Sequence, residues 1–232
     1  CVGNPEDAWQ TAQYTPQIIE PRENQMATIL RDWSYRYQWL YDSISRVAAL
    51  SVGGERRFRQ LPLKSLDITP TMQILDVCCG CGQATRVLVE RSPHVTGLDA
   101  SPLSLARAKR NVPQASYVEA FAEAMPFADE QFDLVHTSAA LHEMAPAQLQ
   151  AILREVYRVL RPKGYFTVID FHSPQNPFFI PGLYLFLLLF ETETSWQFLQ
   201  TDLAQHLQAV GFQTIQRSLH AGGSLQVIQA QK

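Results

Sequence analysis

Short apolar runs alternate with amphipathic segments from Thr71 to the end of the chain. The apolar runs, which we predict to be strands, are residues 72–77, 95–98, 116–119, 132–137, 165–171, 212–219 and 225–230. Between them, apolar positions at helical spacing predict helices over 83–91, 102–111, 146–160 and 196–210. Strands that alternate with helices indicate a mostly parallel sheet with helices on both faces.

The end of the chain departs from this alternation. Only Ala221-Gly222-Gly223 separates the last two predicted strands, so we expect the last strand to be antiparallel. The predicted fold is therefore α/β and Rossmann-like, a doubly wound, mostly parallel seven-stranded sheet with an antiparallel last strand.

Residues 1–60 have a different pattern. Residues 1–25 are polar and proline-containing, which indicates an irregular arm. From Met26 to Leu50, apolar side chains at helical spacing predict one or two amphipathic helices before a break at Gly53-Gly54. We expect 1–60 to form an arm and helices that cover the active site. Residues 61–232 would form the catalytic domain, with an apolar insertion at 174–195.

Composition and charge narrow the function classes. The chain has 232 residues, of which 46% are hydrophobic, and a net charge of −3 without a run of Lys or Arg. A nucleic-acid partner is therefore not expected. Cys78, Cys79 and Cys81 lie too close together for a disulfide framework, and no second pair completes a zinc site. We predict buried thiols, no metal and a cytoplasmic protein.

The segment Phe178–Phe190 is apolar and is interrupted by Pro181 and Gly182. It is shorter than the ~20 residues of a transmembrane helix. Three arrangements would shield it from water. It could pack against the N-terminal helices, line a pocket for an apolar ligand, or make peripheral membrane contact through 178–190. A simple core helix is the alternative.

The stretch Ile74–Gly82 runs from an apolar strand through a glycine turn into a helix. Ligands of doubly wound sheets bind at such carboxyl ends of strands. Asp99 follows Gly80 by nineteen residues and can accept both hydrogen bonds of a ribose diol. These features fit a dinucleotide or S-adenosylmethionine, but the third glycine of the dinucleotide motif is replaced by Thr85.

Four motifs in order resemble class I S-adenosylmethionine-dependent methyltransferases, specifically the type 11 and ubiquinone/menaquinone-biosynthesis families. They are Asp76-x-x-Cys79-Gly80-x-Gly82, Ala122–Phe127, Phe132–Val135 and Glu155–Gly164. The resemblance covers about residues 72–172 and implies S-adenosylmethionine as the cofactor.

The resemblance also implies roles for individual residues. Asp99 would hold the ribose hydroxyls, Gly80 and Gly82 would approach the methionine and ribose, and Asp76 would help to orient the amino group. Ser138 would lie near the methionine end, and Tyr41 of the Tyr41-Asp42 pair would contact the cofactor. The remaining cofactor-binding candidates are Cys78, Cys79, Ala100, Phe121, Ala122 and Glu123.

Two positions depart from the family pattern. Cys78 replaces the first glycine of the turn, so we expect its backbone to avoid left-handed conformations and the turn to be reshaped. Phe121 stands where relatives carry an Asp that meets the adenine amino group. Adenine would then be held by stacking, or by Ala122 and Glu123.

Acceptor-side residues are expected just after the fourth strand. His142 and Glu143 are the catalytic candidates there, because a weak nucleophile needs a base. The alternative is that His142 caps or packs the start of the next helix. Tyr37 and Tyr41 either close over the site or pack as part of an amphipathic helix.

The sequence therefore predicts methyl transfer to a small, lipophilic acceptor such as a prenylated quinol. The alternatives are O- or N-methylation of another hydrophobic metabolite, and a non-catalytic cofactor-binding protein.

Overall fold

The computed structural model describes residues 52–190 and 193–232. The helices predicted within 26–50, with Tyr37 and Tyr41, lie outside the described residues, so the predictions for them stay open. In the described part of the chain, no helix combines the length and apolar character needed to cross a membrane.

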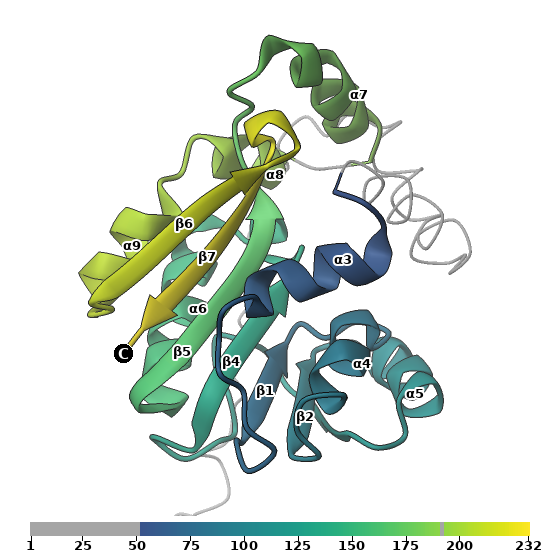
Figure 1. Cartoon of the computed structure of the whole chain (residues 1–232), viewed down its shortest axis with the longest axis vertical. Coiled ribbons are helices and arrows are strands. Elements are labelled where there is room, and N and C mark those ends of the chain that lie inside the picture. Colours follow the sequence, from purple (N-terminus) through teal and green to yellow (C-terminus); the bar gives the residue numbers. More distant parts are fainter. Residues whose placement is uncertain (1–51, 191–192) are drawn as a thin grey trace, which may run out of the picture.

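A seven-stranded sheet forms the centre of the fold, with the strand order β3-β2-β1-β4-β5-β7-β6 (Figure 1). Strand β7 is antiparallel to both β5 and β6, and the other pairs are parallel, which confirms the predicted sheet. The strands are β1 (Ile74–Val77), β2 (Val95–Asp99), β3 (Ser116–Glu119), β4 (Phe132–Ser138), β5 (Leu160–Phe171), β6 (Thr214–His220) and β7 (Leu225–Gln231).

Helices cover both faces of the sheet, as a doubly wound fold requires. Their bounds are α3 (Glu55–Gln60), α4 (Gln83–Val89), α5 (Pro102–Asn111), α6 (Pro146–Val159), α7 (Ile180–Phe190), α8 (Glu193–Leu199) and α9 (Leu203–Val210). The described residues also contain four short 3₁₀ turns, η1 (Leu61–Leu63), η2 (Leu141–Glu143), η3 (Pro177–Phe179) and η4 (Ala221–Gly223).

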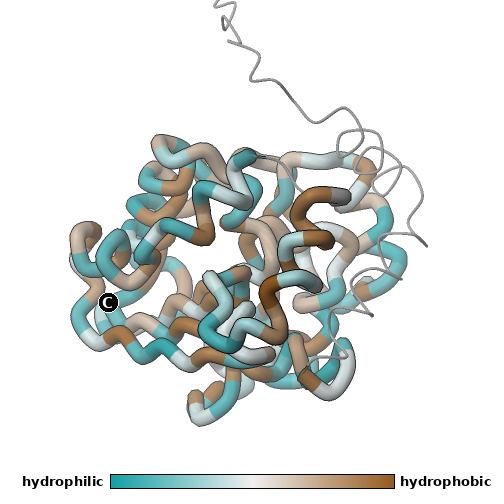
Figure 2. Tube along the Cα trace, turned by 90° about the horizontal axis from the view of Figure 1, so that it is seen from above, coloured by the Kyte–Doolittle hydropathy of each residue, from teal (hydrophilic) through white to brown (hydrophobic). Residues whose placement is uncertain are grey.

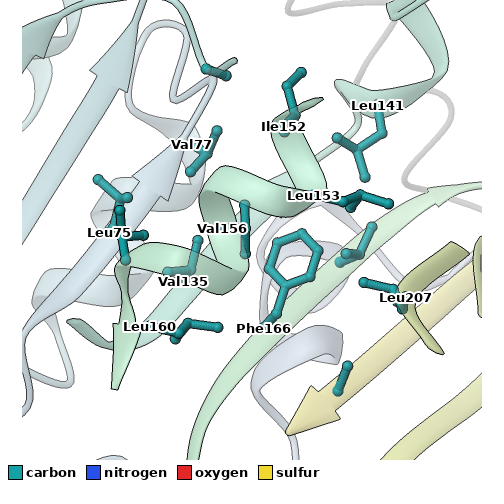
Figure 3. Packing of buried hydrophobic residues seen from close by; sticks show 14 of the residues in the cluster. Leu75, Val77, Val135, Leu141, Ile152, Leu153, Val156, Leu160, Phe166 and Leu207 are labelled. Atoms are coloured by element: carbon teal, nitrogen blue, oxygen red, sulfur yellow. The ribbon is translucent and has the colours of Figure 1, made fainter. Parts of the chain in front are cut away.

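The main core lies between the sheet and the helices α6, α8 and α9 (Figure 3). Helix α6 buries one stripe of side chains, Leu149, Ile152, Leu153, Val156 and Val159, as its apolar spacing predicts. A second cluster joins α4 to the other face of the sheet. Hydrophilic and hydrophobic positions are interspersed along most of the described trace (Figure 2).

One helix prediction was wrong, and one helix was not predicted. The helix predicted over 196–210 is two helices, because the Asp202 side chain accepts a hydrogen bond from the Ala204 N–H and starts α9 anew. Helix α3 was not predicted at all; its six residues are too short to show a helical period. It continues directly into η1 across residue 60, so the domain boundary expected there stays a prediction.

Candidate active site

A cavity of about 450 Å³ opens at the carboxyl ends of β1, β2 and β4. Most of the residues proposed from the sequence line it, although they come from separate segments. They are Asp76, Cys78, Cys79, Gly80, Asp99, Ala100, Phe121, Ala122, Glu123, Ser138 and Glu143. Gly82 and His142 are not among the lining residues, and Tyr41 lies outside the described residues.

The turn between β1 and α4 brings bare backbone to the cavity wall. A Cβ added at Gly80 would find only the Gln83 Oε1, 3.8 Å away, so this glycine leaves open space for a ligand. Gly82 serves packing instead, because a Cβ there would lie 3.3 Å from the Val112 Cγ2. Both glycines have positive φ, 55° and 86°, which side-chain-bearing residues rarely adopt.

The prediction for Cys78 was wrong. Its φ is 55°, in the left-handed region that we expected it to avoid. Ala139, on the neighbouring loop of the same cavity, has φ 54°. A left-handed conformation costs a residue with a side chain about 1–2 kcal/mol, and contacts of the surrounding chain hold it in place. The Cys79 N–H, for example, donates to the Leu98 carbonyl at 3.0 Å.

The cysteines of the turn are packing residues. Burial raises the pKa of the Cys78 and Cys79 thiols well above the usual range, so both stay protonated at neutral pH. A protonated thiol is a poor nucleophile and metal ligand. No group of His, Cys, Asp and Glu in residues 52–190 and 193–232 is arranged to hold a metal ion.

Asp99 stands at the end of β2 with its carboxylate fixed by two backbone donors. The Gly80 N–H donates to its Oδ2 at 2.8 Å, and the Ser101 N–H donates to its Oδ1 at 2.9 Å. Each carboxylate oxygen can accept a further hydrogen bond. The arrangement therefore offers two oriented acceptors to a vicinal diol, and it also ties β2 to the glycine turn.

Asp76 lies at the bottom of the cavity and is almost fully buried. Burial raises its pKa to about 7, although the Thr85 hydroxyl donates to its Oδ2 at 2.6 Å and nearby Arg59 favours its charged form. Thr85 occupies the place of the missing third glycine, so the departure from the dinucleotide motif has a structural purpose. A carboxyl group with this pKa ionises readily beside a cationic ligand.

Arg59 is a buried charged residue of the cavity that was not predicted from the sequence. It projects from α3, is only 5% exposed, and donates from Nη1 to the Ser138 hydroxyl at 2.6 Å. Its positive charge acts on both Asp76 and His136, since it lowers the pKa of each. The cavity thus contains a buried cation beside a carboxyl group, which suits a zwitterionic amino acid.

The cavity wall after β3 combines an exposed ring with a fixed loop. Phe121 is 65% exposed at the cavity wall, whereas Ala122 beside it is buried. The Met125 N–H donates to the Glu155 Oε2 at 2.8 Å, and Arg158 donates to the Met125 and Phe127 carbonyls. The motifs Ala122–Phe127 and Glu155–Gly164, which are far apart in the sequence, are therefore in contact, and the second holds the first in place.

Comparison with known proteins gives the family. A methyltransferase-domain model matches residues 74–164. An uncharacterized methyltransferase of Synechocystis is 58% identical over 205 residues, which cover 88% of this chain and 97% of that protein. The chain belongs to the S-adenosylmethionine-dependent methyltransferases.

More distant relatives agree with this assignment. A 2-phytyl-1,4-naphtoquinone methyltransferase of Thermosynechococcus vestitus is 29% identical over 83% of this chain and 94% of that protein. The crystal structure of an S-adenosylmethionine-dependent methyltransferase from Mesorhizobium loti has a TM-score of 0.58, with 19% identity, over 78% of this chain and all of that one. This structural likeness shows the fold.

The turn η2 after β4 is built around a buried histidine. The His142 Nδ1 lies 2.6 Å from the Asp170 Oδ1, and the Leu141 N–H donates to the other carboxylate oxygen at 2.8 Å. His142 is 3% exposed and does not line the cavity. This placement favours the alternative that His142 packs and orients η2.

Glu143 follows His142 in η2 and reaches the cavity wall. Aromatic contacts lead from the same turn to α7: the rings of His142 and Phe171 are 4.4 Å apart, and those of Phe171 and Phe186 are 5.7 Å apart. The apolar insertion therefore adjoins η2, the turn that contains His142 and Glu143.

Proposed function

We propose that the chain transfers a methyl group from S-adenosylmethionine to a small lipophilic acceptor such as a prenylated quinol. The observation that carries the proposal is a single cavity in which Asp99 and the Gly80 turn face Glu143, next to the apolar insertion. The relative from Thermosynechococcus vestitus, named for a phytyl-naphthoquinone, supports this class of acceptor.

The residues present fit the cofactor. The bare backbone at Gly80 leaves room for it, and the oriented Asp99 carboxylate would accept from its ribose diol. Arg59 would hold its carboxylate, and Asp76 would face its amino group. Phe121 would stack on the adenine, which replaces the hydrogen bond of an Asp at that position.

When bound, S-adenosylmethionine supplies a methyl group already activated by the sulfonium charge. The protein has to align the acceptor, exclude water and take up the acceptor's proton. We assign the proton to the Glu143 carboxylate, because Glu143 lines the cavity. His142, paired with Asp170, would keep η2 and hence Glu143 in position.

A turnover screen tests this function. The full chain would be incubated with labelled S-adenosylmethionine and with matched demethyl-quinols, phenols and amines, each with and without a prenyl chain. We expect methylation of a prenylated quinol and a much lower rate for its counterpart without the chain. Turnover of an amine or a polar phenol alone would overturn the acceptor class.

Calorimetric titration with S-adenosylhomocysteine separates an enzyme from a non-catalytic scaffold. Binding without turnover on any acceptor would favour a cofactor-binding protein. The absence of binding would overturn the role of the cavity as well.

A further inference from the structure

A second, larger hollow lies on another part of the molecule. It measures about 700 Å³ and is bordered by α3 and η1 on one side and by β6, β7 and η4 on the other. None of its lining residues also lines the cavity of the active site. The hollow is therefore a separate site, and the methyltransferase reaction does not account for it.

Positive charge gathers in this hollow. Arg57, Lys64, Arg217 and His220 line it, and no Asp or Glu of residues 52–190 and 193–232 is among the lining residues; we call it the basic pocket. Arg217 pairs with Asp202 at 3.0 Å, but Arg57 and Lys64 form no ion pair with any side chain in residues 52–190 and 193–232. These charges also act inside the pocket. Burial lowers the pKa of His220, and the positive charges of Lys64 and Arg57 lower it further.

Exposed apolar side chains belong to the η3–α7 segment, which packs against a turn at the border of the basic pocket. Turn η4, which supplies Ala221 to the pocket, packs through Gly222 against the ring of Phe179 in η3. The ring of Phe178, 5.6 Å from that of Phe179, is 83% exposed, and Leu185 on the following α7 is 57% exposed. Figure 1 shows α7 and the η4 turn together at one end of the molecule.

Cationic and apolar groups together indicate a particular kind of partner. A soluble phosphate compound would use the cations and leave the phenylalanine in water, whereas a protein groove would not require unpaired cations. The boundary of an anionic membrane offers phosphate groups beside hydrocarbon, and it attracts both kinds of side chain.

We propose that the basic pocket binds the phosphate of an anionic lipid while Phe178 and Leu185 enter the membrane beside it. Arg57 and Lys64 would then gain the counter-charge that they lack within the described protein. Docking at this surface goes beyond the proposed function, since it concerns a different site and does not depend on which acceptor is methylated.

Vesicle co-sedimentation of the full chain tests the proposal. We expect binding to mixed phosphatidylcholine–phosphatidylglycerol vesicles, weaker binding to phosphatidylcholine alone, and loss of the difference at high salt. The double variant Arg57→Ala/Lys64→Ala should bind the anionic vesicles about 30-fold more weakly, from the contribution of two cations near such a surface. Phe178→Ser should weaken binding to both kinds of vesicle.

A matched control removes the same charge elsewhere. Lys109→Ala/Arg110→Ala changes two exposed cations on α5, at the opposite end of the sheet, and should bind like the parent. If both double variants lost the same affinity for anionic vesicles, binding would depend only on net charge, and the proposed role of the basic pocket would be overturned. Failure of the parent to bind anionic vesicles would overturn the proposal outright.

Inorganic pyrophosphate provides the remaining comparison. If it binds the parent but not Arg57→Ala/Lys64→Ala while anionic vesicles do not bind, the pocket serves a soluble anion and the membrane inference falls. Affinity for S-adenosylhomocysteine should be the same in parent and double variant, which keeps this test separate from that of the proposed function.

Discussion

The cofactor side and the acceptor side of the cavity are built in different ways. At the glycine turn of the cofactor side, backbone groups near the strand ends fix the geometry: the Gly80 N–H donates to Asp99, and the Cys79 N–H donates to the Leu98 carbonyl. On the acceptor side, side chains from remote segments fix the geometry. His142 pairs with Asp170, 28 positions later in the sequence, and the Ser195 hydroxyl, 53 positions later, donates to the His142 carbonyl.

This difference separates what the fold dictates from what the individual protein adds. A glycine turn and a carboxylate at adjacent strand ends follow from the sheet itself, so they are common to methyltransferases of many substrates. The turn η2, the end of β5 and the helices after it form one unit of side-chain contacts. We expect changes there to affect turnover and acceptor choice, and changes on the cofactor side to affect cofactor affinity.

The largest expected effect is on the acceptor side. Glu143→Gln removes the proposed base and should lower kcat about 100-fold. Affinity for S-adenosylhomocysteine, measured by calorimetry, should stay within about twofold of the parent, because Glu143 faces the acceptor in this assignment.

Glu123→Gln is the matched control, since it changes a carboxylate on the adenine side of the same cavity. We expect a change in affinity and not in kcat. If Glu143→Gln kept normal turnover while His142→Asn lost it, the base would be His142. The assignment of Glu143 as base and His142 as positioning residue would then be wrong.

Asp99→Ala tests the cofactor side. Loss of hydrogen bonds between a charged group and the ribose hydroxyls should weaken S-adenosylhomocysteine binding by about 1.5–3 kcal/mol. Titration calorimetry measures this directly, with circular dichroism melting to check that the turn still folds. Unchanged affinity in a folded variant would rule out the ribose role.

Arg59→Met sharpens the cofactor side further. Affinity for S-adenosylhomocysteine should fall about tenfold to a hundredfold, from the loss of a charged hydrogen bond to its carboxylate. Binding of 5′-methylthioadenosine, which lacks the amino-acid part, should be unaffected and reports any general damage to the site. Arg56→Met, in the exposed part of the same helix, serves as the control; equal losses for the two ligands would contradict the assignment.

The smallest expected effect is a pH dependence from Asp76. Its pKa is raised to about 7 by burial, so the free carboxyl is mostly protonated at pH 6 and mostly ionised at pH 8. A cationic amino group favours the ionised form, and affinity for S-adenosylhomocysteine should rise about tenfold across this interval. Asp76→Asn should flatten the profile; an unchanged slope would assign the titration to another group.

The sequence predicted the parts of the fold that have a period or a local motif. All seven predicted strands are present, in a mostly parallel sheet whose last strand is antiparallel, as predicted. The break between α8 and α9 was not predicted, because a capping Asp within an apolar period leaves the period intact. Helix α3 has too few residues for periodicity to detect.

In the site, too, the sequence predicted the residues that belong to a local motif and missed those that depend on tertiary contacts. Asp99 and the Gly80 turn follow from a motif, whereas Arg59 is one of three arginines in α3, and nothing local marks the one that turns inward. The burial of His142 depends on Asp170, which the sequence does not connect to it. Cys78 was predicted wrongly because tertiary contacts impose a conformation that its own preference disfavours.

A crystal structure of the full chain with S-adenosylhomocysteine tests the central claim most directly. The account predicts density in the cavity with the ribose diol on the Asp99 carboxylate, the carboxylate of the ligand on Arg59 and the adenine against Phe121. An empty cavity, or a ligand bound with its ribose away from Asp99, would contradict it.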